Sequence, residues 1–148
     1  MSKIKTLAIT AAMALAVLGG VASEAFAAAE INVAPGRTLK GPGVAVHGYD
    51  PVAYFTQQRP VQGSAAYSVV HGGGTYRFAN AGHMKMFKAN PARYVPAFGG
   101  FCAYGVAVGA KFDGDPRYWK IVDGRLYLNL NKQIQKTWLK DVPGALSR

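Results

Sequence analysis

Cys102 is the only cysteine in the chain, and it lies in the glycine-rich segment GGFCAYGVAVG, residues 99–109. An unpaired cysteine in an exported protein indicates a free reactive thiol, a metal ligand or an intermolecular disulfide. A buried structural thiol packed among small residues is a further interpretation. The fold has to decide between these roles, because no second cysteine exists to close an intramolecular bridge.

A second group of candidate ligands lies on the segment AGHMKMFKAN, which has the composition of a short helix ending at an Asn-Pro step. At about 100° per residue, His83 falls in the middle of an apolar arc that also holds Met84 and Met86. Thiolate and thioether ligands select Cu(I), and imidazole also suits copper. Cys102, His83, Met86 and Met84 therefore form a candidate soft-metal site, if the fold brings Cys102 to this helix. The alternative for His83 is a core histidine with one hydrogen-bond partner.

The segment HGYDPVAYF, residues 47–55, allows two interpretations. Asp50 before Pro51 is a typical helix start, with the aspartate as N-cap and the proline at the first helical position. The aromatic residues around Asp50 could instead line a pocket for a small molecule or a protein partner. The candidate pocket residues are His47, Tyr49, Asp50, Tyr54 and Tyr104.

A cysteine-dependent enzyme is the third interpretation of the chain. It requires a base and an orienting group near Cys102. His47, His71 and His83 are available as bases, but no spacing between them and Cys102 indicates a particular triad. We therefore expect no enzymatic activity and name no catalytic residue.

The N-terminus predicts export. Residues 1–27 combine Lys3 and Lys5, an apolar run and the small-residue ending Ala25-Phe26-Ala27, as in a cleavable signal peptide. The mature protein would be periplasmic or secreted, with no stable membrane anchoring after cleavage. Residues 28–43 are predicted to be a flexible leader, and residues 44–148 a single domain.

The chain has a formal net charge of +10 from 17 basic and 7 acidic residues. The basic residues are scattered, and export removes the usual nucleic-acid target, so a nucleic-acid partner is not expected. A solvated basic surface is the simpler interpretation.

The remaining pattern predicts an α+β domain with two β-hairpins and several short helices. Residues 64–78 form one hairpin around Gly72-Gly73-Gly74, and Asp123-Gly124 turns the other. Asp115-Pro116 resembles a helix start, and a final helix spans roughly 131–140. The segment around Cys102 fits either a strand or a helix. No internal repeat is evident.

Several segments together resemble the YHS domain family in its stand-alone exported form. They are GYDPVAYF, TYRFANAGHMKMFKANPARYVP, GGFCAYGVAVG, DPRYWKIVDGRLYLNLN and the closing Trp138. Their order and spacing cover nearly all of the chain from Val44 to Asp141. The resemblance implies a small α+β domain related to proteins that handle heavy metals.

Shorter members of that family carry core segments of the form DPVCGM and YFCSxxC. Here Ala53 and Tyr54 stand where the first motif has Cys and Gly. In the second motif, Ala79 replaces the first cysteine and His83 the second. His83 is thus the ligand position that the resemblance retains.

The sequence hypothesis is therefore an exported protein that sequesters or delivers a soft metal, most plausibly copper. Cys102 would be the thiolate ligand, His83 the imidazole ligand and Met86 or Met84 a weaker third. The alternative is a binding module with a small-molecule or protein partner and no metal.

Overall fold

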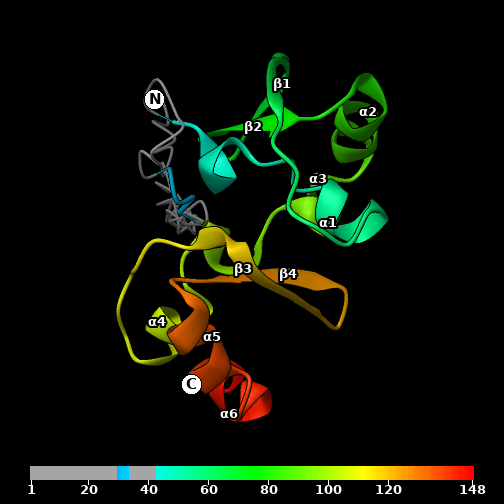
Figure 1. Cartoon of the computed structure of the whole chain (residues 1–148). Coiled ribbons are helices and arrows are strands. Elements are labelled where there is room, and N and C mark those ends of the chain that lie inside the picture. Colours follow the sequence, from blue (N-terminus) through cyan, green and yellow to red (C-terminus); the bar gives the residue numbers. More distant parts are fainter. Residues whose placement is uncertain (1–29, 34–42) are drawn as a thin grey trace, which may run out of the picture.

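A computed structural model describes residues 30–33 and 43–148 of the chain (Figure 1). The predicted signal peptide, residues 1–27, lies outside the described residues. The elements form two successive sets, here called the first half (residues 45–94) and the second half (residues 97–146). The first half contains the 3-10 turn η1 (Ala45–Gly48), α1 (Ala53–Thr56), β1 (Ser64–His71), β2 (Gly74–Phe78), α2 (Ala81–Ala89) and α3 (Pro91–Tyr94). The second half contains η2 (Ala97–Gly100), α4 (Ala103–Ala107), β3 (Asp115–Val122), β4 (Arg125–Asn129), α5 (Lys132–Trp138) and α6 (Val142–Leu146).

The two halves repeat the same backbone plan. Ser64 pairs with Phe78 in the first hairpin, and Asp115 pairs with Asn129 in the second, so matched positions differ by 51. All other hairpin pairs follow the same spacing, and both ladders shift register at the same point. In the turns η1 and η2 the spacing is 52, and it is also 52 between the bond from Thr56 N–H to Val52 O and the bond from Val108 N–H to Tyr104 O. The expectation of no internal repeat was therefore wrong.

Rare backbone features also recur at matched positions. Val46 (φ 53°) and Phe98 (φ 54°) both occupy the left-handed region, which bulky residues seldom enter. Gly63 and Gly114 both lie where a Cβ atom would collide with backbone, 2.5 Å from Arg77 C and 2.2 Å from Gly100 O respectively. The repeat is hidden in the sequence because it rests on turn geometry and packing positions, which many residue pairs can satisfy.

An aromatic pair fixes the helix onto the hairpin in each half. The ring centroids of Tyr76 and Phe87 lie 4.9 Å apart in the first half, and those of Tyr127 and Trp138 lie 5.4 Å apart at the matched positions. All four side chains are buried. Burial of such rings is among the larger sources of stability in a small domain.

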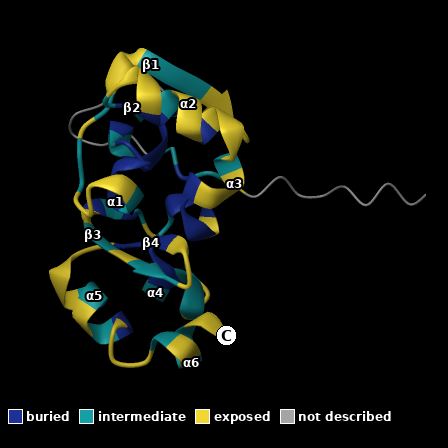
Figure 2. Cartoon of the chain, turned by 90° about the vertical axis from the view of Figure 1, so that its right-hand side faces the viewer, coloured by how far each residue is buried: buried dark blue, intermediate teal, exposed yellow. Residues whose placement is uncertain are grey.

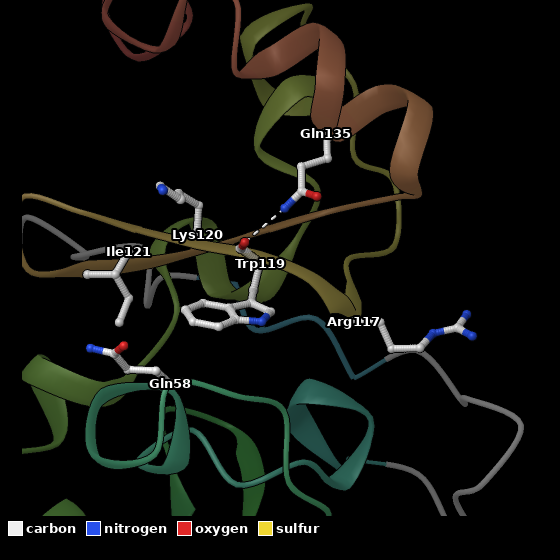
Figure 3. Close-up of a pocket in the computed structure, with 6 residues that line it drawn as sticks. All are labelled: Gln58, Arg117, Trp119, Lys120, Ile121 and Gln135. Carbon is white, nitrogen blue, oxygen red and sulfur yellow. Dashed lines mark hydrogen bonds between the residues drawn. The ribbon is translucent and has the colours of Figure 1, made fainter.

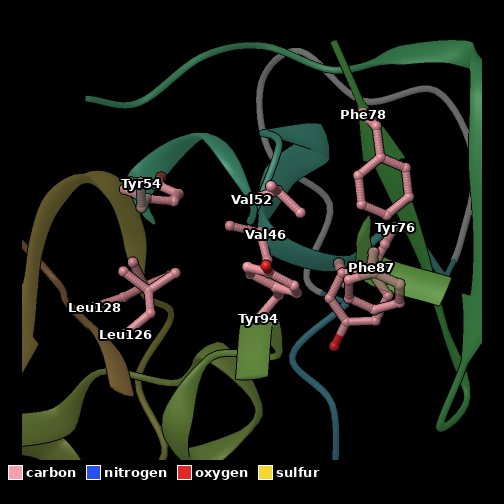
Figure 4. Close-up of a cluster of buried hydrophobic side chains, with 10 residues drawn as sticks. Val46, Val52, Tyr54, Tyr76, Phe78, Phe87, Tyr94, Leu126 and Leu128 are labelled. Atoms are coloured by element: carbon pink, nitrogen blue, oxygen red, sulfur yellow. The ribbon is translucent and has the colours of Figure 1, made fainter. Parts of the chain in front are cut away.

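The other face of β4 joins the two halves. Successive side chains of a strand point to opposite faces, so Leu126 and Leu128 face away from Tyr127. These leucines pack with Tyr54 and Tyr94 of the first half in the main cluster of the core (Figure 4). At the matched positions β2 carries Thr75 and Arg77, which are half-buried. The second hairpin is thus covered on both faces, whereas the first has one face in the main cluster (Figure 2).

The α+β class with two hairpins is confirmed, and most predicted helix starts are as expected. Asn80 and Asn131 each cap a helix by accepting from the backbone N–H three residues later. Asp123 and Gly124 both have positive φ in the second hairpin turn. The segment after Cys102 is the helix α4.

The helix predicted at Asp115-Pro116 is wrong, because this dipeptide begins strand β3. Proline is tolerated as an early strand residue. The Asp115 carboxylate binds the backbone N–H and the guanidinium of Arg117, and the Asp115 backbone pairs with Asn129.

The described part of the predicted leader is attached to the domain. Asn32 is buried; its backbone N–H donates to Gly99 O, and its side chain donates to Gly100 O and Asp113. Ile31 packs against the main cluster. Residues 30–33 therefore belong to the folded unit, ahead of the expected start at Val44.

Among residues 30–33 and 43–148, no helix has the length and apolar character needed to cross a membrane.

Candidate functional site

Cys102 lies at the start of α4, where it caps the helix. Its side chain is fully buried, its sulfur accepts from Gly105 N–H at 3.5 Å, and its thiol donates to Asn129 Oδ1 at 3.7 Å. Sulfur is a weak acceptor and the thiol a weak donor. The polar partners of this sulfur come from the second half.

The structure does not bring Cys102 and His83 together. Helix α2, which carries His83, lies near the β1–β2 hairpin, whereas α4 lies on the other side of the β3–β4 hairpin in both views (Figures 1 and 2). Phe87 of α2 belongs to the main cluster, whereas Ala103 beside Cys102 belongs to the second cluster. The four-residue soft-metal site expected from the sequence is not assembled in this conformation.

Of the two methionines, only Met84 lies on the apolar side of α2 that the sequence pattern predicts. Met84 is half-buried and packs against the main cluster, but Met86 is 39% exposed on the outer side of α2. The apolar arc of this helix is therefore narrower than the sequence pattern indicates. In the described residues no group of three or more His, Cys, Asp or Glu side chains is placed to hold a metal ion.

His83 is instead linked to Asp50 and Thr56. Its Nδ1 lies 2.6 Å from Asp50 Oδ2, and its Nε2 lies 3.2 Å from Thr56 Oγ1. Because a carboxylate only accepts, Nδ1 carries a proton, and in the neutral ring Nε2 is the acceptor. A metal at His83 would have to displace the Thr56 hydroxyl.

Asp50 is fully buried and binds the backbone at the start of α1, although the helix begins at Ala53 with Val52 as its N-cap, later than the Asp-Pro pattern predicts. One carboxylate oxygen accepts from the backbone N–H groups of Val52 and Ala53, at 2.8 and 3.3 Å. The other accepts from the N–H of Ala79 at 2.9 Å as well as from His83. This carboxylate therefore ties α1 to the end of β2 and to α2.

The other predicted pocket residues pack against two different clusters of the core. Tyr49 and Tyr104 are half-buried and pack against the main and the second cluster respectively. Tyr54 is fully buried, and its hydroxyl donates to Pro116 O at 2.8 Å. Burial raises the pKa of Tyr54, so the phenol keeps the proton that this bond uses. Tyr49 and Tyr54 therefore lie with the main cluster, and Tyr104 lies with the second.

His47 forms a separate polar pair with Asp113. Its Nε2 lies 2.7 Å from Asp113 Oδ1, and this bond raises the pKa of His47. Burial of the Asp113 carboxyl favours its neutral form, but the bonds from His47 and Asn32 outweigh that effect, so the pKa of Asp113 is lowered. The pair links the first turn to the loop before β3 and to residues 30–33.

A pocket of about 570 Å³ lies along the outer edge of β3, where the two halves meet (Figure 3). Its lining combines an indole, an aliphatic chain, two carboxamides and two cations. The residues are Trp119, Ile121, Gln58, Gln135, Arg117 and Lys120. The volume lies within the usual range of roughly 300–1,000 Å³ for small-molecule sites.

Neighbouring groups hold the walls of this pocket. The Trp119 ring meets the buried Tyr54 ring edge to face, with centroids 5.1 Å apart. Gln135 Nε2 donates to the Trp119 carbonyl at 2.8 Å, which fixes α5 against the edge of β3. Arg117 binds Asp115, whereas Lys120 has no ion-pair partner among the described residues. The pocket therefore offers an ordered aromatic wall and an unpaired ammonium group.

The sequence interpretation missed this pocket. Gln58 and Gln135 are 77 positions apart, and nothing in their local patterns indicates that they share a site. The available signal was the strand alternation that places Arg117, Trp119 and Ile121 on one face of β3. Tyr54, which the sequence predicts as a pocket residue, packs against the Trp119 ring that lines this pocket.

Comparison of the chain with protein-family models, with curated proteins and with solved structures finds no match. The resemblance to the YHS family stays a prediction.

Proposed function

We propose that this protein is a binding module that takes a small ligand into the pocket between Trp119 and Gln58. The observation that carries the proposal is the lining of that pocket, in which apolar, amide and cationic groups from both halves lie along the edge of β3. Ligand sites typically combine an apolar surface with a few placed polar groups, and they favour junctions between structural units.

The repeat provides an internal control for this choice. At the positions of β1 matched to Arg117, Trp119 and Lys120, the first half has Ala66, Ser68 and Val69. Small residues therefore satisfy the same strand geometry. The aromatic and cationic groups of β3 are not needed for the hairpin itself, which favours a role in binding.

The charges predict which ligands fit best. Lys120 and Arg117 are the charged residues of the lining, and the whole chain is strongly basic. An anionic ligand gains from both effects. Among benzoate, benzamide and benzylamine, we expect benzoate to bind most tightly, by about tenfold or about 1.4 kcal/mol.

The test uses the two tryptophans. In ¹H–¹⁵N spectra of residues 28–148, benzoate should shift the indole N–H of Trp119 and the side-chain amides of Gln58 and Gln135. The indole N–H of Trp138, buried in the second cluster, is the internal reference. Trp119→Ser, which installs the residue of the matched position, should abolish the shifts.

A charge-matched control separates the pocket from the general basic surface. Lys120→Gln should weaken benzoate binding, whereas Arg125→Gln, at an exposed site on β4, should leave it unchanged. Equal effects of both variants, or no shift at Trp119 with any probe, would contradict the proposal.

A further inference from the structure

The polar chain Asp50–His83–Thr56 is not required by the fold. At the matched positions the second half has Cys102, Ile134 and Val108. There Cys102 caps α4, and α5 packs onto its hairpin without an ionisable pair. The same architecture is thus built without this chain.

Placing a charge in a core is costly, and replacing a buried ion pair by apolar residues is often neutral or stabilising. Asp50 is fully buried and His83 is 9% exposed. Because the second half shows that apolar residues can fill these positions, the retention of Asp50 and His83 points to a role beyond packing.

Burial decreases stepwise along the chain of three side chains. The Asp50 carboxylate is fully buried, the His83 ring is nearly buried, and Thr56 is exposed at the end of α1. Asp50 is immobilised by three backbone N–H groups, so it can hold the imidazole with Nε2 directed at the Thr56 hydroxyl. An orienting carboxylate, a histidine base and an accessible hydroxyl in this order are the parts of a nucleophilic triad.

We propose that Thr56 is a nucleophile activated by His83, that Asp50 is the positioning residue, and that the substrates are small carboxylic or phosphoric esters. Thr56 Oγ1 forms a bond to the carbonyl carbon or phosphorus, and its proton passes to His83 Nε2. The bond to the leaving oxygen breaks, and that oxygen takes the proton from His83. Water then hydrolyses the acyl or phosphoryl threonine by the same proton path.

The geometry at Thr56 is compatible with this role. Its hydroxyl lies 3.2 Å from His83 Nε2 and also 3.2 Å from Val52 O, so its one proton can be directed to either acceptor. Nucleophile–base contacts in the absence of substrate are often longer than in the reacting complex. This site lies outside the pocket lining, so the proposal is independent of ligand binding at Trp119.

Thr137 is a control within the same molecule. Its hydroxyl donates to Gln133 O at 3.2 Å, the same bond to the fourth preceding residue that Thr56 makes to Val52 O. In the described residues Thr137 has no histidine partner. Thr137 is half-buried whereas Thr56 is exposed, so the contribution of His83 is read from this comparison only together with the His83→Gln variant.

The experiment treats residues 28–148 with diisopropyl fluorophosphate, in which the leaving group is fluoride, and locates adducts by peptide mass spectrometry. We expect an adduct on Thr56 and none on Thr137. Thr56→Ser should retain the adduct, Thr56→Val should lose it, and His83→Gln should slow its formation by about 100-fold.

Three results would overturn the proposal: no adduct at Thr56, equal modification of Thr56 and Thr137, or unchanged labelling in a folded His83→Gln variant. If His83→Gln does not fold, the exposed hydroxyl of Ser147, which donates to Gly144 O, is the reference in the parent protein: labelling of Thr56 no faster than that of Ser147 overturns the proposal. Loss of labelling leaves the benzoate shifts at Trp119 unaffected, so failure of this proposal and failure of the binding function are distinguishable.

Discussion

The first half and the second half of this domain share a backbone but differ in the chemistry they carry. After its left-handed turn, the first half binds the backbone at the start of α1 with the carboxylate of Asp50, and the second half caps α4 with the thiol of Cys102. The first half adds His83, whereas the second has Ile134 at the matched position. Comparison of the halves thus distinguishes the features that this backbone requires, which both halves share, from side chains that occur in one half only.

In the hairpins it is the second half that carries the additional aromatic and charged side chains. Strand β3 presents Trp119 and Lys120 at the seam, while β1 has Ser68 and Val69 at the matched positions. Each half therefore holds one specialised site: a buried carboxylate–histidine pair in the first, and a pocket wall in the second. A repeated scaffold lets the two sites vary without altering the hairpins that support them.

The largest expected effect concerns the aromatic anchors of the two halves. Phe87→Ala and Trp138→Ala each remove a buried ring from its hairpin, and each should lower the free energy of unfolding by about 3–5 kcal/mol. Because Leu126 and Leu128 of the second half belong to the main cluster, both variants should still unfold in one transition. Urea unfolding followed by circular dichroism tests this. Two separate transitions would show that the halves are independent units.

The two side chains that bind the backbone at the starts of α1 and α4 should differ strongly in their contribution to stability. Asp50→Ala leaves three backbone N–H groups and His83 without their acceptor and should cost about 3–5 kcal/mol, as for a broken buried pair. Cys102→Ala removes only weak sulfur contacts and should cost about 1 kcal/mol. Chemical unfolding of both variants measures the difference. Equal losses would contradict the distinction drawn between the two side chains.

A smaller, pH-dependent effect is expected at the turn η1, where His47 occupies the position that Gly99 occupies in η2. Since the pKa of His47 is raised, its pair with Asp113 stabilises the protein fully below the unfolded value of 6.5, and this contribution is lost as pH rises through the folded pKa. Because the pKa of Asp113 is lowered, the contribution also falls in acid, as pH drops through the folded pKa of Asp113.

Both side chains of this pair are partly exposed, so the contribution should be about 1 kcal/mol or less. The free energy of unfolding of the parent protein and of His47→Gln, measured from about pH 4 to about pH 9, tests this, because that range spans the ordinary pKa values of Asp and His. The difference between the two proteins should be largest on the acidic side of neutrality. A difference that grows toward alkaline pH would contradict the assignment.

The smallest effect is expected for copper. Since α2, which carries His83, packs in the main cluster and α4, which Cys102 caps, packs in the second, Cys102→Ser and His83→Gln should not both weaken Cu(I) binding by tenfold. An anaerobic competition titration of residues 28–148 measures this. If both variants lose tenfold or more in Cu(I) affinity, the soft-metal site expected from the sequence forms in another conformation, in which Cys102 and His83 come together.

Local chemistry made part of this structure predictable. Asp123-Gly124 specifies its hairpin turn, and Asn80, Asn131 and Asp50 specify helix starts, because each acts on backbone groups within a few positions. The alternation of Tyr76 and Phe78 likewise predicts the buried face of its strand. By itself, the sequence therefore determined the α+β class and the position of most elements.

Tertiary packing decided the rest. Asp115-Pro116 has the local chemistry of a helix start, but pairing with Asn129 makes it a strand. Cys102 and His83 are compatible ligands as residue types. Their helices nevertheless pack in different places, α2 in the main cluster and α4 in the second. The bond between Asp50 and His83 and the meeting of Gln58 with Trp119 depend on the same arrangement. Such contacts join distant segments, so their free energy exists only once both hairpins are packed.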